Sequence, residues 1–124
     1  MSRMKIATWN VRGFGSDQKK SMVKNLIWKE KIDLIGLTET KIQEFTAWDL
    51  KRCWGNVAAE WEQVSARQTS GGIIVTWNQQ AFSKINSFAM QRWICIMGEI
   101  TENKIQCVFC VVYAPNSNTE RQEV

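Results

Sequence analysis

The apolar positions predict alternating strands and a helix in the first part of the chain, and short strands in the second. Residues 5–11 form a short apolar run typical of a buried strand, and residues 33–39 form another with little alternation, as expected for a strand that is covered on both faces. Between them, apolar residues recur at helical spacing: Met22, Val23, Leu26 and Ile27. A strand–helix–strand unit with a right-handed crossover predicts two parallel strands, whose carboxyl ends meet at one edge of a sheet.

Local signals mark the ends of these elements. Residues 12–15 (RGFG) follow the first strand as a loop that needs the conformational freedom of glycine. Ser16 can cap the helix, and Asp17 is favourable in its first turn. Lys29 and Lys31 suit the negative end of the helix dipole. The predicted helix therefore begins after Ser16 and ends near Lys29 and Lys31.

The pattern changes after Lys41. Residues 42–54 can hold a short helix that ends at Gly55. Further strands are predicted at about 59–65, 73–77, 93–100 and 104–113, with turns at 70–72 and 101–103. This second part indicates antiparallel hairpins. The predicted class is α/β (α+β), with a mixed sheet and a flanking helix in one domain over residues 1–124.

Composition narrows the function classes only modestly. A net charge of +4, with sixteen scattered Lys and Arg residues, permits contact with a polyanion but does not require it. No run approaches the roughly 18 apolar residues of a membrane span. The start of the chain lacks a secretory signal, so we expect an intracellular protein whose four cysteines are free thiols.

Two strand ends carry the candidate chemistry. Asn10 ends the first predicted strand, and Glu39 ends the second. A carboxylate at such a place suits Mg²⁺, which keeps several waters and takes one or two protein carboxylates, and a neighbouring amide can orient a phosphate. The alternative is that Glu39 is a solvated loop residue and Asn10 a turn former.

Four blocks around these residues resemble one protein family. They are residues 9–13 (WNVRG), 38–41 (TETK), 70–75 (SGGIIV) and 113–116 (YAPN), in that order. The series resembles the endonuclease/exonuclease/phosphatase family, which includes the apurinic/apyrimidinic endonucleases. The sequence of residues 5–13 (KIATWNVRG) is most similar to the endonuclease of plant LINE-type (non-LTR) retrotransposon polyproteins. The resemblance covers the whole chain but only the first half of the family's domain.

The resemblance implies roles for four residues. Asn10 corresponds to an Asn that contacts phosphate and metal, and Glu39 to the metal-ligand Glu. Tyr113 corresponds to the Tyr beside the scissile phosphate, and Asn116 to an Asn that contacts a DNA phosphate. The implied reaction is hydrolysis of a DNA phosphodiester with Mg²⁺ or Mn²⁺, in the nucleus. The implied fold is a four-layer αββα sandwich.

The sequence departs from this family in its later catalytic groups. It has no histidine, and its three aspartates are Asp17, Asp33 and Asp49, none of which can be the family's catalytic residues. We therefore expect the truncated chain to be inactive, because removing members of a catalytic unit costs several orders of magnitude in rate. We also expect one sheet with an uncovered inner face that promotes self-association. The alternatives are a non-catalytic nucleic-acid- or protein-binding remnant, or a phosphatase of small phosphoesters.

Other patterns have competing interpretations. The loop around Gly13 resembles part of a dinucleotide-binding fingerprint, but Gln18 stands at the third glycine position. Cys107 and Cys110, three positions apart on a strand, should face opposite sides, which favours packing over metal binding. The seven tryptophans fill the core or stack on bases. The lysines of the first helix are expected to form a solvated face: Lys19, Lys20, Lys24 and Lys29.

Overall fold

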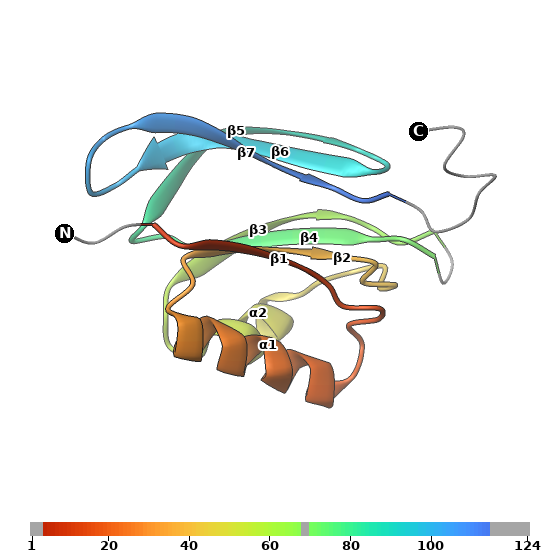
Figure 1. Cartoon of the computed structure of the whole chain (residues 1–124). Coiled ribbons are helices and arrows are strands. Elements are labelled where there is room, and N and C mark those ends of the chain that lie inside the picture. Colours follow the sequence, from red (N-terminus) through yellow and green to blue (C-terminus); the bar gives the residue numbers. More distant parts are fainter. Residues whose placement is uncertain (1–3, 68–69, 115–124) are drawn as a thin grey trace.

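The computed structural model describes residues 4–67 and 70–114, which form two helices and two β-sheets in three layers. Figure 1 shows the helices below a first sheet of β1 to β4, with a second sheet of β5 to β7 above it. The elements are β1 (Ile6–Asn10), α1 (Asp17–Glu30), β2 (Leu34–Thr38), α2 (Ala47–Trp54), β3 (Ala59–Val64), β4 (Ile73–Asn78), β5 (Phe82–Met90), β6 (Trp93–Ile100) and β7 (Gln106–Val112). No helix in this part of the chain is long and apolar enough to cross a membrane.

The first sheet has the strand order β1-β2-β4-β3 and is mixed. β1 pairs in parallel with β2, and Asn10 lies opposite Thr38 at the carboxyl ends of both strands. β4 then pairs antiparallel with β2 on one side and β3 on the other. The predicted strand–helix–strand unit is confirmed. All five residues of β2 are buried, because this central strand is covered on both faces.

Capping side chains start both helices. Ser16 accepts a hydrogen bond from the backbone N–H of Lys19 at 3.2 Å, and Asp17 follows it in the first turn of α1. In α2, Thr46 and Asp49 form a reciprocal capping box. Burial opposes ionisation of Asp49, but hydrogen bonds from Thr46 and Lys20 outweigh it and hold the pKa of this carboxyl below its usual range.

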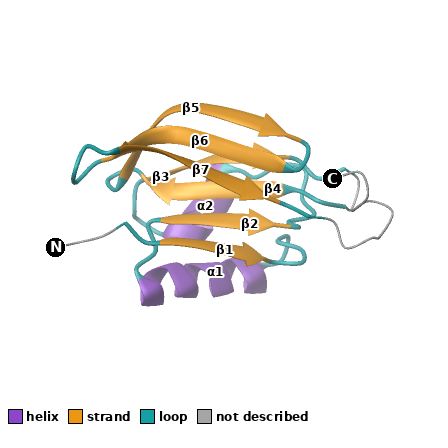
Figure 2. Cartoon of the chain, turned by 45° about the horizontal axis from the view of Figure 1, so that its top comes forward, coloured by secondary structure: helices purple, strands orange, loops and turns teal. Residues whose placement is uncertain are grey.

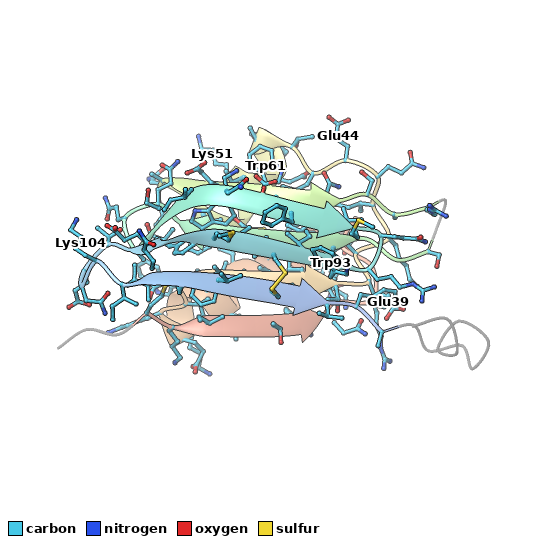
Figure 3. The ribbon with its side chains drawn as sticks, turned by 90° about the horizontal axis from the view of Figure 1, so that it is seen from above. Glu39, Glu44, Lys51, Trp61, Trp93 and Lys104 are labelled. Carbon is cyan, nitrogen blue, oxygen red and sulfur yellow. A yellow bond between two sulfur atoms is a disulfide. The ribbon has the colours of Figure 1, made fainter. Side chains whose placement is uncertain are left out.

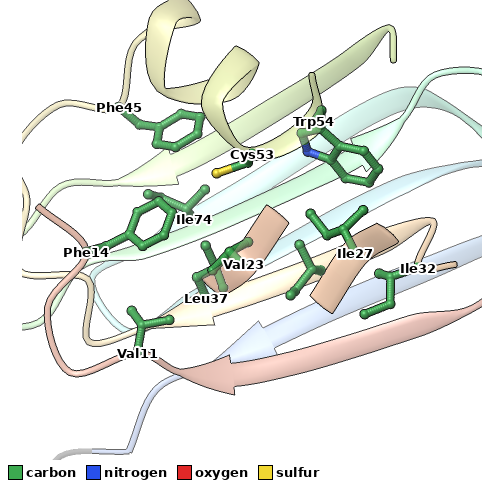
Figure 4. Packing of buried hydrophobic residues seen from close by; sticks show 11 residues of the cluster. Val11, Phe14, Val23, Ile27, Ile32, Leu37, Phe45, Cys53, Trp54 and Ile74 are labelled. Carbon is green, nitrogen blue, oxygen red and sulfur yellow. The ribbon is translucent and has the colours of Figure 1, made fainter. Parts of the chain in front are cut away.

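A hydrophobic cluster fills the space between the helices and the first sheet (Figure 4). Val23 and Ile27 of α1 pack there on Leu37 of β2 and Ile74 of β4. The indole N–H of Trp54 donates to Oγ1 of Thr76 at 2.9 Å, which satisfies a polar group that the cluster would otherwise leave unpaired. This packing secures α2 to the sheet.

The expectation of one sheet with an uncovered inner face is wrong. The second sheet, with strand order β5-β6-β7, covers that face and forms a second hydrophobic cluster with it (Figure 2). The ring of Trp77 lies edge-on to that of Phe82, with 6.1 Å between the ring centroids. A Cβ atom at Gly36 would lie 2.6 Å from Cγ2 of Val111, so the missing side chain lets β2 and β7 approach closely.

The sequence pattern did not predict β5 because a bulge changes its phase. The pairing of β5 with β6 shifts register between Lys84 and Asn86. The apolar residues Phe82, Ile85 and Phe88 therefore recur every three positions, a spacing that does not indicate a strand of period two. The hairpin of β5 and β6 is what brings the second sheet over the first.

The uncovered face of the structure is the outer face of the second sheet. Three cross-strand rows of this outer face are mostly apolar: Met90, Trp93 and Val112; Phe88, Cys95 and Cys110; Asn86, Met97 and Val108. A fourth row, Ser83, Glu99 and Gln106, is polar and lies at one end of the face. Within the three apolar rows Asn86 is the one polar member, and no member is charged. Figure 3 looks onto this outer face. Val108 is 53% exposed and Val112 is 62% exposed, so a large apolar surface faces solvent.

The expectation of four free thiols is also wrong. Cys95 and Cys110 are joined by a disulfide, visible as the yellow bond in Figure 3. They are direct register partners on β6 and β7, with 4.1 Å between their Cα atoms. Sequence spacing could not identify this pair, because it depends on the register of two strands. Cys110 is exposed whereas Cys107 packs on the inter-sheet cluster, so the prediction that they face opposite sides is confirmed.

Two thiols should therefore react in the unfolded chain without reductant, and four after reduction. Mass spectrometry after alkylation in denaturant measures this number directly. In the folded chain Cys107 should react before Cys53, because burial leaves Cys53 1% exposed and raises the pKa of its thiol to about 12. Four thiols reacting without reductant would contradict the disulfide.

Candidate functional site at the carboxyl ends of β1 and β2

Backbone hydrogen bonds bring the sequence blocks together at one end of the molecule. The first block meets the second where N–H of Gly13 donates to the carbonyl of Glu39 at 2.8 Å. The second meets the third where N–H of Lys41 donates to the carbonyl of Gly71 at 2.8 Å. A Cβ atom at Gly71 would lie 4.0 Å from Cε2 of Tyr113, which places the fourth block alongside. Segments up to about a hundred positions apart in the sequence thus share one edge.

Asn10 lies at the exposed end of β1. Side chains alternate along a strand, so Asn10 is on the face of the sheet opposite Trp9, which packs on the helix-side cluster. Its register partner Thr38 shares its face. Oδ1 of Asn10 accepts a weak hydrogen bond from N–H of Arg12 at 3.3 Å. This contact orients the amide so that its NH₂ group remains available as a donor.

Glu39 follows β2 directly and has a left-handed backbone conformation, with φ of 56°. Its Oε2 atom is buried and accepts no hydrogen bond from the residues that the structure describes. A buried carboxylate oxygen without a donor is costly, and native proteins rarely leave one. Oγ1 of Thr40 is buried in the same unpaired state. The two orphaned oxygens follow one another at the end of β2.

Positive φ angles are concentrated at this edge. Among residues other than glycine, Arg12, Glu39 and Lys41 have φ between 51° and 59°, and Gly71 and Gly72 add two more positive values. Such backbone costs roughly 1–3 kcal/mol at each residue with a side chain and is concentrated at functional sites. A Cβ at Gly72 would collide with Oγ1 of Thr40, so only glycine fits there. The strain therefore lies where the loops meet.

Tyr113 directly follows β7, and the arrowhead of β7 lies at the same end of the molecule as Glu39 (Figure 3). Its N–H donates to the carbonyl of Arg92 at 2.8 Å. Beside it lies a cavity of about 230 Å³, lined by Ser65, Arg67, Ser70, Gly71, Gly72, Gln91, Arg92 and Tyr113. The described lining residues include two arginines, whose guanidinium groups suit an anion. Asn116 lies outside the described residues.

Sequence reasoning did not identify Arg67 and Arg92. Arg92 lies in the turn between β5 and β6, and that turn was missed together with β5. Arg67 precedes the glycine-containing block, and N–H of Arg67 donates to the carbonyl of Ser70 at 2.9 Å. A basic residue beside a glycine loop is a phosphate-binding signal that could have been used.

The residues at this edge fit a divalent cation held by one protein carboxylate. Among the described residues no three His, Cys, Asp or Glu side chains come together. The aspartates are engaged elsewhere: Asp49 pairs with Lys20 at 3.1 Å, and Asp17 pairs with Arg52 at 3.1 Å. Glu39 is then the acidic candidate ligand directly at the ends of β1 and β2, since Glu44 lies exposed further along the same loop. Its orphaned oxygen suits Mg²⁺ or Mn²⁺ with a largely water-filled shell.

The chain matches no protein-family model and no curated protein sequence. Solved structures do match it. The AP endonuclease LMAP from Leishmania major superposes with a TM-score of 0.67 at 19% identity, over 93% of this chain and 41% of that protein. The catalytic domain of human nocturnin gives a TM-score of 0.65 at 16% identity, over 93% of this chain and 52% of that domain.

The Xenopus laevis APE2 catalytic domain gives a TM-score of 0.64 at 16% identity, over 97% of this chain and 48% of that domain. The chain thus spans about half the length of these proteins. Identities this low establish the fold and leave the activity open. The expected α/β class is confirmed: this chain has the fold of the AP endonucleases and their endonuclease/exonuclease/phosphatase relatives, over about half of their length.

Proposed function

We propose that this chain supplies the Asn–Glu half of a divalent-metal-dependent DNA endonuclease of the LINE-retrotransposon type. One observation carries the proposal: Oε2 of Glu39 is buried and unpaired in the described structure, beside the end of β1. A carboxylate oxygen in this state lacks a cation or a donor. Solved neighbours include an AP endonuclease and a 3′ phosphatase bound to a DNA hairpin, which supports DNA as the substrate.

Each residue then has a chemical role. Glu39 holds Mg²⁺ or Mn²⁺, and the cation would supply stabilisation of negative charge on the phosphoryl oxygens. Asn10 donates from its amide to a phosphate oxygen, because Oδ1 is occupied by N–H of Arg12. Tyr113 lies against the Gly71 loop and orients the phosphate. The cavity beside Tyr113 receives an adjacent backbone phosphate.

By itself the chain binds and does not cut. Activation of the attacking water needs a general base. The sequence contains no histidine, and Asp17, Asp33 and Asp49 are tied to α1, the start of β2 and α2. None of these carboxylates is positioned to activate water at Glu39. A nuclear location would follow from this function.

A nicking assay tests the activity. The 124-residue chain should leave supercoiled plasmid intact with Mg²⁺ or Mn²⁺. A fusion to the Asp- and His-bearing half of an endonuclease of the same fold should nick it, and EDTA should stop the nicking. A folded fusion without metal-dependent cleavage would reject the enzyme hypothesis in favour of a non-catalytic remnant.

We also propose that the outer face of β5, β6 and β7 promotes self-association. Three of its four cross-strand rows carry no charge, so a second copy can approach there despite the net charge of +4. Light scattering after size exclusion should show a dimer or larger species. Val108→Lys, in the edge strand β7 of this face, should shift the species towards monomer. Thr101→Lys adds the same charge in a turn and should not; a monomeric parent chain would refute the proposal.

A further inference from the structure

A second hollow lies at the opposite end of the first sheet from Glu39. A groove of about 880 Å³ runs between the C-terminal half of α1 and the end of α2. It reaches Asp33 and Asn78, which lie at the start of β2 and the end of β4. Glu39 follows the other end of β2, so it lies about 20 Å away at the usual rise of about 3.3 Å per residue. The groove is therefore separate from the site at the carboxyl ends.

The floor of the groove is apolar and its rim carries an exposed tryptophan. Ile27, Ile32 and Trp54 form the floor and are less than 10% exposed, at 8%, 4% and 5%. Trp28 stands at the rim and is 83% exposed. Large aromatic side chains usually bury most of their area, so a free indole beside a groove indicates a contact surface. Of the two roles considered for the tryptophans, core packing is therefore excluded for Trp28.

The rim is also strongly basic. Lys24, Lys29 and Lys31 line the groove, and Lys51 lines the hollow that continues it past Trp54. Within the described structure none of these four lysines forms an ion pair. Asp33 is the one carboxylate in either lining, and its Oδ2 accepts a hydrogen bond from N–H of Lys5 at 2.9 Å.

The expected solvated lysine face of α1 divides into two groups. Nζ of Lys19 donates to the carbonyl of Val11 at 2.7 Å, and Lys20 is held by Asp49. Lys24 and Lys29 remain exposed at the groove. Lys29 also offsets the negative end of the α1 dipole, but Lys24 lies more than a turn before that end and Lys51 lies on the other helix. Their common location at the groove therefore needs another explanation.

We propose that this groove binds single-stranded nucleic acid. A base stacks on Trp28 over the apolar floor, and neighbouring phosphates contact the lysines of the rim. Basic grooves with an exposed aromatic ring bind single strands without sequence preference, because every unpaired base offers a stacking face. A duplex keeps its bases stacked inside and cannot use Trp28 in this way. This site adds a function to the metal edge and does not depend on it.

Fluorescence anisotropy of a labelled oligothymidine about 12 nucleotides long tests the proposal. Trp28→Ala should weaken binding roughly 5- to 100-fold, the loss expected for one stacked base. Trp48→Ala is the matched control, because Trp48 is 67% exposed on α2 and outside the groove. Equal affinity of the Trp28 variant and the parent would overturn the proposal. Circular dichroism establishes that each variant is folded.

The salt dependence of binding tests the contribution of the lysines. The double variant Lys24→Gln, Lys51→Gln should bind with less sensitivity to salt. The slope of the logarithm of the binding constant against the logarithm of the salt concentration should become shallower by about 0.7 for each lost phosphate contact on a single strand. Lys104→Gln, in the turn between β6 and β7, should leave the slope unchanged. An unlabelled duplex or an acidic peptide that competes as well as the single strand would reject the proposed ligand. Glu39→Gln and EDTA should not affect this binding. A failure of the groove proposal is therefore distinguishable from a failure of the metal-site proposal.

Discussion

Replacing Trp77 with alanine is expected to remove much of the chain's free energy of unfolding. Trp77 is fully buried between the two sheets and packs edge-on to Phe82. Removing so large a side chain from a core costs about 3–5 kcal/mol. Small domains have total stabilities of about 5–15 kcal/mol, so the loss takes much of what is available. Nε1 of Trp77 has no partner in the described structure, so the loss is almost entirely one of packing.

Urea unfolding followed by far-ultraviolet circular dichroism measures this effect. Trp48→Ala removes the same side chain from a surface position and should change the free energy of unfolding by less than about 0.5 kcal/mol. Trp77→Phe keeps most of the ring contact and no hydrogen bond is lost, so its cost should be intermediate. Similar stabilities for the Ala variants at positions 77 and 48 would contradict the two-sheet packing.

Replacing Glu39 with glutamine should separate function from stability. The amide keeps the size of the side chain but removes its charge, so affinity for Mn²⁺ should fall by at least about tenfold. In the nicking-competent fusion, cleavage should fall by at least about 100-fold. The free energy of unfolding should not fall, because a buried carboxylate oxygen without a donor is itself destabilising.

Calorimetry with Mn²⁺ measures the affinity on the 124-residue chain itself. Glu44→Gln is the matched control, because Glu44 is an exposed glutamate on the loop before α2 (Figure 3). Its Mn²⁺ affinity and nicking rate should equal those of the parent. Unchanged Mn²⁺ binding in the Glu39 variant, or a clear loss of stability, would show that Glu39 has a structural role and is not a metal ligand.

Predictions that rest on contacts close in the chain agree with the structure. Ser16 caps α1, and Gly55 follows α2, because capping involves a few neighbouring backbone groups. The edge that joins Asn10 to Glu39 follows from the parallel pairing of β1 and β2, which the crossover helix imposes. The placement of Asn10 and Glu39 at one edge was therefore predictable from strand ends alone. The metal-binding roles themselves stay predictions.

The sequence by itself determined the elements whose hydrophobic period is regular, and the polar residues that end them. Only the tertiary structure decided that β5 exists as a bulged strand, that a second sheet covers the first, and that Cys95 bonds to Cys110. It also decided that the orphaned oxygen of Glu39 and the exposed ring of Trp28 lie at opposite ends. The physical reason is the same throughout: local periodicity reports which face of an element is apolar, whereas register and sheet packing depend on contacts between distant segments.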